Sequence, residues 1–87
     1  MRVPTISSFF GITISMYWGD HPPGHFHARY QDFEAVFDLE GELLEGAMPP
    51  RQRRIISGWA AIHQEELEQD WARAVGREEL ALIRGIE

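Results

Sequence analysis

"HFHARYQDFEAVFDL", residues 25–39, predicts a β-hairpin. A two-residue loop, Gln31-Asp32, would join strands over 25–30 and 33–39. In this register one face carries only apolar or small side chains, and a slip of one residue would destroy the pattern, so the register is well specified. The paired residues of that face are Tyr30 with Phe33, Ala28 with Ala35, and Phe26 with Phe37.

The opposite face of the hairpin collects polar and titratable side chains. This concentration exceeds what a solvated surface needs, so we treat the face as a candidate functional surface. The same pairing sets His25 across from Asp38, His27 across from Val36, and Arg29 across from Glu34.

Further strands flank the hairpin. The segment 11–18 alternates apolar and polar residues, which is the period-two pattern of a half-buried strand. A turn at residues 40–41 returns the chain as a strand over 42–46, with Leu44 facing Phe37. We therefore expect an antiparallel meander of three to four strands.

A single long helix is predicted over about 50–75. Proline is tolerated in a first helical turn, which suits Pro50, and Gly76 is a suitable residue to end the helix. The helix would pack on the apolar face of the meander, giving an α+β fold, and the tail 77–87 is expected to be extended rather than helical. The predicted apolar stripe comprises Ile55, Ile56, Trp59, Ala60, Ile62, His63, Leu67, Trp71 and Ala74.

Length and composition narrow the class of protein. The 87 residues fit one domain, 1–87, and the absence of cysteine excludes disulfides, thiolate metal ligands and a cysteine nucleophile. The N-terminus does not resemble a signal peptide, and no apolar run approaches the about 20 residues of a membrane helix. We therefore expect a cytoplasmic protein with no membrane association. A net charge of −6 argues against a large nucleic-acid surface, so charge does not support an RNA partner.

The segment "GDHPPGHFHARY" (19–30) holds three of the four histidines. Imidazole nitrogens bind zinc and other divalent transition metals, and two histidines at alternate positions of a strand point to the same side. One hypothesis is therefore a metal site formed by His21, His25 and His27, with Asp20 as a fourth ligand or as a group that orients them.

Three other interpretations of this segment stay open. His25 and His27 are candidates for a general acid/base pair, with Arg29 holding an anion, as in a small histidine-dependent or metal-assisted ribonuclease. The polar face is also suited to docking a protein partner without chemistry. The remaining interpretation is a tight turn in which Asp20 caps backbone amides and the histidines are structural.

Two features lie outside this segment. His63 falls within the apolar stripe of the helix, where it is expected to be a core histidine. Arg51, Arg53 and Arg54 begin the helix, where the helix dipole already favours anions, so they are a weak candidate for an anion-binding site.

The sequence resembles the domain-of-unknown-function 4160 family of small bacterial proteins. The similarity rests on "PTISSFFGITISMYWGDHPPGHFHARY" (4–30) and on "WAAIHQEEL" (59–67). It spans residues 4 to 73, and Gly24 stands where many members carry proline. The family motif points to Asp20, His21, His25, His27 and His63 as the site residues.

The resemblance implies a partner more than an activity. Such proteins are thought to be encoded beside another small protein, in an arrangement like a toxin–antitoxin pair. We therefore expect a small component of a two-gene system with a histidine-rich site, in which the partner is a small protein encoded nearby. The exposed edge of the strand at 42–46 also allows a homodimer.

Overall fold

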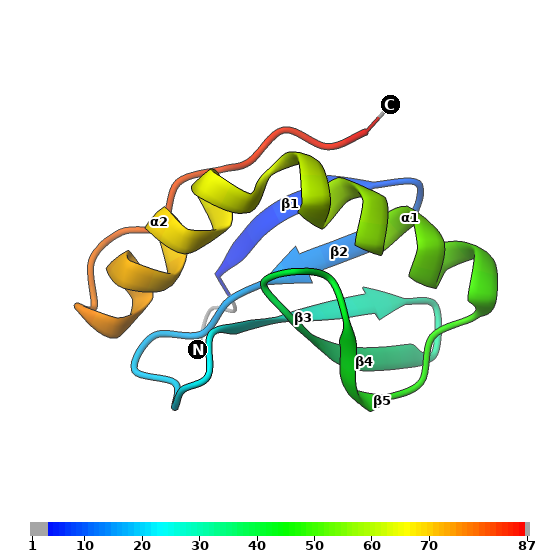
Figure 1. Ribbon diagram of the computed structural model, residues 1–87, viewed down its shortest axis with the longest axis horizontal. Helices are drawn as coiled ribbons and strands as arrows, with labels where there is room; N and C mark the ends of the chain where they lie inside the picture. The colour runs from blue at the N-terminus through cyan, green and yellow to red at the C-terminus, as the bar shows by residue number, and fades with distance from the viewer. Residues whose placement is uncertain (1–3, 87) are drawn as a thin grey trace.

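The computed structural model describes residues 4–86, and the ends of the predicted domain, 1–3 and 87, lie outside it. Five antiparallel strands form one sheet in chain order, β1-β2-β3-β4-β5, and two helices cover one of its faces (Figure 1). The α+β class is confirmed, but the expected strand number is too low. The strands are β1 (Thr5–Phe9), β2 (Ile12–Ser15), β3 (His25–Tyr30), β4 (Phe33–Asp38) and β5 (Leu43–Gly46).

β1 is the strand that the sequence pattern missed. It pairs with β2 through a tight turn at Phe10 and Gly11, where both residues have positive φ, 49° and 76°. A glycine in the second position suits such a turn, because glycine adopts positive φ without a steric penalty. β2 ends at Ser15 rather than at residue 18, so the chain leaves the sheet earlier than predicted.

The predicted hairpin is present with the predicted register. Tyr30 pairs with Phe33, and the alignment continues to His25 opposite Asp38. The expected contact between Leu44 and Phe37 is wrong: a bulge between Val36 and Phe37 shifts the β4–β5 register, so that Leu43 lies opposite Phe37. The side chain of Leu44 is consequently exposed.

The single long helix is replaced by two helices, α1 (Pro50–Ile62) and α2 (Gln64–Val75). They meet at His63, whose backbone angles, φ −110° and ψ 31°, are not helical. The side-chain amide of Gln64 ties this junction to the turn after β4 by donating to the backbone carbonyl of Leu39. Because of the break, the predicted apolar stripe is not continuous, and Ile62 is 70% exposed.

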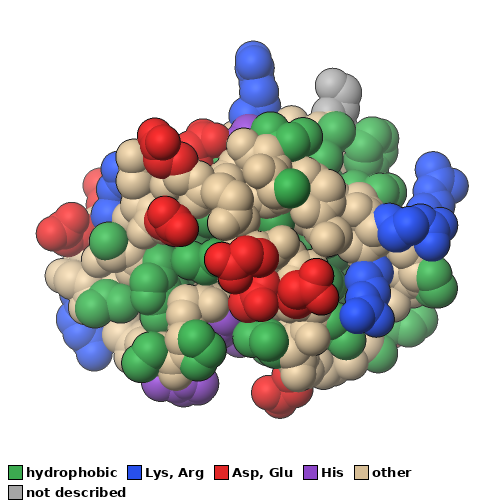
Figure 2. All heavy atoms as spheres, viewed as in Figure 1, with side chains coloured by type: hydrophobic (Ala, Val, Ile, Leu, Met, Phe, Trp, Pro, Cys, Tyr) green, Lys and Arg blue, Asp and Glu red, His purple; other side chains and the backbone are tan. Residues whose placement is uncertain are grey.

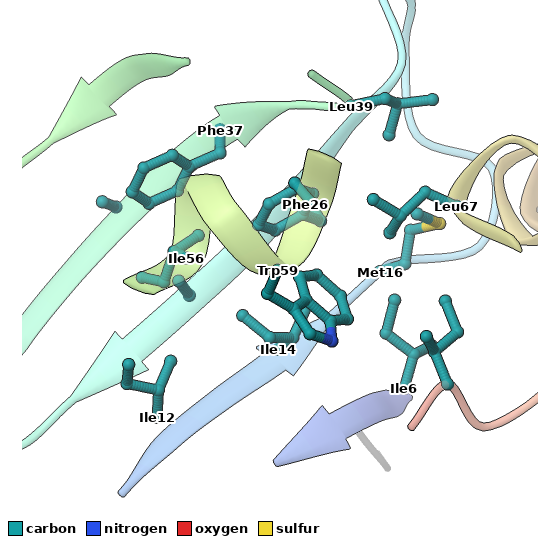
Figure 3. Close-up of a cluster of buried hydrophobic side chains, with 14 of the residues drawn as sticks. Ile6, Ile12, Ile14, Met16, Phe26, Phe37, Leu39, Ile56, Trp59 and Leu67 are labelled. Carbon is teal, nitrogen blue, oxygen red and sulfur yellow. The ribbon is translucent and has the colours of Figure 1, made fainter. Parts of the chain in front are cut away.

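The core lies between the helices and the sheet, with Trp59 near its centre (Figure 3). The Trp59 ring packs 5.2 Å from the ring of Phe9 and 5.7 Å from that of Phe26. Its indole N–H donates to the carbonyl of Arg84 at 2.9 Å, so the buried polar atom is satisfied. Figure 3 shows side chains from β1 to β4, from the loops that follow β2 and β4, and from both helices gathered around Trp59: Ile6, Ile12, Ile14, Met16, Phe26, Phe37, Leu39, Ile56 and Leu67.

The C-terminal segment, residues 77–86, runs beside the helices without forming a helix or a strand (Figure 1). Ile83 is buried, and its backbone N–H donates to the carbonyl of Ile6 on β1 at 2.7 Å. The fully buried carboxylate of Asp70 accepts the N–H of Ala81 at 2.9 Å. The C-terminal segment is therefore held by buried side chains and isolated hydrogen bonds, not by the continuous hydrogen bonding of a paired strand.

In the part of the chain that the structure describes, neither helix has the length and apolar character needed to cross a membrane.

Candidate metal centre

Three side chains predicted as metal ligands converge at one end of β3. Asp20 lies in the loop between β2 and β3, while His25 and His27 are two residues apart on β3. Asp20 Oδ2 is 2.7 Å from His25 Nε2 and 3.5 Å from His27 Nε2. One donor atom from each residue lies within 4.8 Å of the other two. Figure 2 shows histidine side chains at the lower edge of the molecule, where Figure 1 places this loop.

His25 is held in one tautomer by the backbone. Its Nδ1 lies 2.7 Å from the carbonyl of Pro23, and since a carbonyl only accepts, Nδ1 carries the proton. Nε2 is thereby directed at Asp20. A hydrogen bond from the second imidazole nitrogen to a carbonyl is the arrangement by which proteins orient histidine ligands. The residue is only 5% exposed, so this orientation is enforced by packing as well.

His27 has an unpaired ring nitrogen. Its Nε2 is buried and has no hydrogen-bond partner, because Asp20 at 3.5 Å is too distant for good geometry. The ring packs edge-on against Tyr17, with centroids 4.4 Å apart. Burial lowers the pKa of His27 below its usual value of 6.5, and Asp20 only partly opposes this shift. His27 therefore offers a neutral nitrogen, which is the form that binds metals.

Asp20 supplies the negative charge of the site. Burial alone would raise the pKa of this carboxyl, but hydrogen bonds from the backbone N–H of His21 and from His25, together with the nearby imidazole of His27, hold that pKa below its usual value of 3.8. The His21 N–H is 2.9 Å from Oδ1, which leaves Oδ2 for the histidines. A carboxylate between two imidazoles is thus available as an anionic ligand.

The other candidates beside the loop stand apart from this group. The His21 side chain is 82% exposed, its Nε2 lies 3.8 Å from Asp20 Oδ1, and its Nδ1 lies near the carbonyl of Pro22. Arg29 is exposed and pairs loosely with Glu34 at 3.5 Å. Of the four predicted metal residues, three form the compact group and His21 borders it.

His63 does not join the site. It lies at the junction of the helices, where its Nδ1 contacts Glu66 at 2.5 Å and its ring packs 5.7 Å from that of Trp59. It is therefore neither a member of the cluster nor a fully buried core residue.

The predicted anion-binding arginines all lie in the first turns of α1. Figure 2 shows basic side chains gathered at the end of the molecule where α1 begins. Arg53 and Arg54 border a hollow of 280 Å³ that also includes Glu42, and all three arginines are exposed. They lie at the opposite end of the helical layer from α2.

A groove of 520 Å³ runs over the uncovered face of the sheet and reaches the cluster at His27. Direct strand pairing builds one cross-strand row along it, from hydroxyls on β1 and β2 to a carboxylate on β5. The sequence anticipated the polar face but not that neighbouring strands would align this row. Its members are Thr5, Ser15, His27, Val36 and Glu45.

Trp71 was predicted to be an ordinary core residue, and its place at the site was missed. It is half-buried, and its ring lies 5.2 Å from that of His25. No signal in the sequence distinguishes it from Trp59, because both fall at helical spacing. The break at His63 and the path of α2 bring Trp71 to the loop between β2 and β3, here called the ligand loop.

The family model described as a domain of unknown function (DUF4160) matches residues 11–72. The chain therefore belongs to this family, as the sequence resemblance indicated. The match includes all three clustered residues and Trp71, and it excludes β1 and the C-terminal segment. No curated protein and no solved structure shows a significant match to the chain.

Proposed function

We propose that the protein binds one divalent transition metal ion, with zinc as the first candidate, through Asp20, His25 and His27. The observation that carries the proposal is the convergence of one oxygen and two imidazole nitrogens within 4.8 Å of one another. Two histidines with one carboxylate are a ligand set used for zinc and for non-haem iron.

The protonation of the site supports an ion in this position. The Nδ1–H of His25 donates its hydrogen bond to the carbonyl of Pro23, so a hydrogen bond between Nε2 and Asp20 Oδ2, which lie 2.7 Å apart, requires a second proton on one of these two atoms. A bound cation would displace that proton and satisfy both atoms, as metal binding generally does. It would also give the buried Nε2 of His27 the partner that it lacks.

The surroundings suggest that the ion would be open to a ligand. Three protein ligands leave further coordination positions, as in catalytic zinc sites, and His27 also lines the groove. The groove carries Glu34 and Glu45, while its Arg29 is already paired with Glu34. This charge distribution favours a neutral ligand over an RNA backbone, so metal-assisted RNA cleavage is less well supported than metal binding.

The test is a calorimetric titration of the untagged protein with Zn²⁺ after treatment with a chelator. We expect one ion per chain, with binding lost in His25→Ala and in His27→Ala. The matched control is His63→Ala, which removes a histidine outside the site and should bind as the wild type does. Failure of the wild type to bind, or equal binding by all four proteins, would contradict the proposal.

A second candidate function is docking of a partner, and the groove on the uncovered sheet face favours it. The partner would be the small protein encoded nearby, in the toxin–antitoxin-like arrangement that the family resemblance implies. Co-expression of the two proteins should yield a complex that Val36→Arg, placed in the groove, disrupts. Leu44→Arg, exposed on β5 and not among the residues lining the groove, is the control. Absence of a complex, or equal loss with both variants, would count against this function.

A further inference from the structure

We infer that Trp71 is a positioning residue for the proposed metal site: it holds the His25 imidazole in the orientation that directs Nε2 at Asp20. This inference rests on the metal-binding function proposed above. The two rings lie 5.2 Å apart at 50°, and Trp71 reaches the site from α2.

The end of α2 is fastened to the segment that leads into the ligand loop. The N–H of Gly19 donates to the carbonyl of Ala74 at 3.0 Å, and the indole N–H of Trp18 donates to the carbonyl of Glu78 at 2.7 Å. These contacts immediately precede Asp20 in the chain. The position of the loop is therefore set by the last turn of α2 and the start of the C-terminal segment.

Gly24, at the other end of the loop, lies close to Leu39 and within ordinary van der Waals distance of the Trp71 indole. A Cβ at this position would lie 3.5 Å from a Trp71 ring carbon and 2.9 Å from a methyl of Leu39. The β2–β3 loop therefore lies against the indole of Trp71 at Gly24 as well as at His25. Asp20 and His25 are thus positioned by contacts to the same helix.

The indole supplies a restraint that the backbone does not. The hydrogen bond from Nδ1 to Pro23 fixes one atom of the His25 ring, but the ring can still tilt about that contact. The bulky indole, tilted by 50° beside the imidazole, limits the movement of the His25 ring and helps to exclude water, consistent with the 5% exposure of His25. Without it, Nε2 would be free to turn away from Asp20 and to be hydrated.

The experiment compares Zn²⁺ affinity and the visible spectrum of the Co²⁺ form in full-length wild type, Trp71→Leu and Trp71→Phe. Trp71→Leu keeps an apolar side chain but removes the flat ring, so we expect binding about tenfold weaker or more, as for other groups that orient metal ligands. Trp71→Phe should recover most of the affinity and the wild-type Co²⁺ spectrum. Leu67→Val, buried on the same helix, controls for general loosening of α2 and should bind normally.

The outcomes separate the two proposals. If the wild type binds no metal, the proposed function fails and the inference fails with it. If the wild type binds and Trp71→Leu binds equally well with an unchanged Co²⁺ spectrum, metal binding stands and Trp71 only fills space. If Leu67→Val weakens binding as much as Trp71→Leu, the effect belongs to the stability of α2 and the inference is overturned.

Discussion

Asp20 Oδ2 and His25 Nε2 lie 2.7 Å apart, although one residue belongs to a loop and the other begins a strand. The carbonyl of Pro23 accepts a hydrogen bond from Nδ1 of the His25 imidazole. This contact orients the ring so that its second nitrogen, Nε2, points toward Asp20. An acid and a base at this distance share a proton in the absence of a metal ion. At this pair, protonation would compete with the proposed metal binding.

Asp20→Asn should weaken zinc binding by at least about tenfold, because an amide oxygen carries no charge and is a poor zinc ligand. The control is Asp32→Asn, a change of the same kind in the exposed β3–β4 turn. Competition with a chromophoric chelator measures both affinities. Equal affinities for the two variants would remove Asp20 from the site.

Stability without metal should fall as the pH drops below about 6.5, the usual pKa of histidine. Burial lowers the pKa of His27 in the folded state, so the unfolded chain binds the extra proton first and acid favours unfolding. Asp20 acts at lower pH: its lowered pKa contributes stability above about 3.8, which is lost as the pH falls through its folded value.

Urea midpoints at pH 7.5 and 5.5, with chelator present, measure this effect. His27→Gln should show a smaller drop between the two pH values than the wild type, whereas His63→Gln should retain the drop. An unchanged pH dependence in His27→Gln would mean that other groups account for the acid sensitivity.

Asp70→Ala should destabilise the fold by about 2 kcal/mol, since it removes hydrogen bonds to a buried carboxylate. Asp70 is fully buried and accepts the N–H of Ala81 and a guanidinium N–H of Arg73. The same change at Glu68, exposed on α2, is the control. Hydrogen exchange should show loss of protection at Ala81, and a retained, protected amide there would contradict the role of Asp70 as an anchor.

Two glycines should respond to alanine in opposite directions. Gly41 has φ +91°, and a Cβ there would lie 2.9 Å from the backbone of Ser57, so Gly41→Ala should destabilise the protein. Gly58 is exposed within α1 with nothing within 4 Å of an added Cβ, so Gly58→Ala should stabilise by about 0.5–1 kcal/mol. Thermal melts of the two variants test both expectations. A Gly41→Ala variant as stable as the wild type or more stable would refute the packing at Gly41, and a destabilised Gly58→Ala variant would refute the open space at Gly58.

Local patterns in the sequence were sufficient for the β3–β4 hairpin. The alternation over 25–39 determines its register, because only one alignment puts Phe26 and Phe37 on the same face, and the structure has that alignment. The proximity of His25 and His27 follows from the same period of two, since alternate residues of a strand point to one side.

Local patterns failed where long-range contacts decide the outcome. β1 has too few apolar residues to be recognised from its own sequence, and it forms a strand because it pairs with the edge of β2. The apolar spacing over 50–75 is compatible with one helix, whereas the contact of Gln64 with Leu39 ties the His63 junction to the turn after β4.

Residues near one another in the chain are enough to specify the β3–β4 hairpin and the histidine-rich loop beside it, and the motif residues are enough to indicate the family. Tertiary structure alone selected Asp20, His25 and His27 from the candidates and left His21 exposed and His63 at the helix junction. It also brought Trp71 onto His25. The physical reason is that a ligand site depends on distances between segments far apart in the chain, and packing of the helices against the sheet sets those distances.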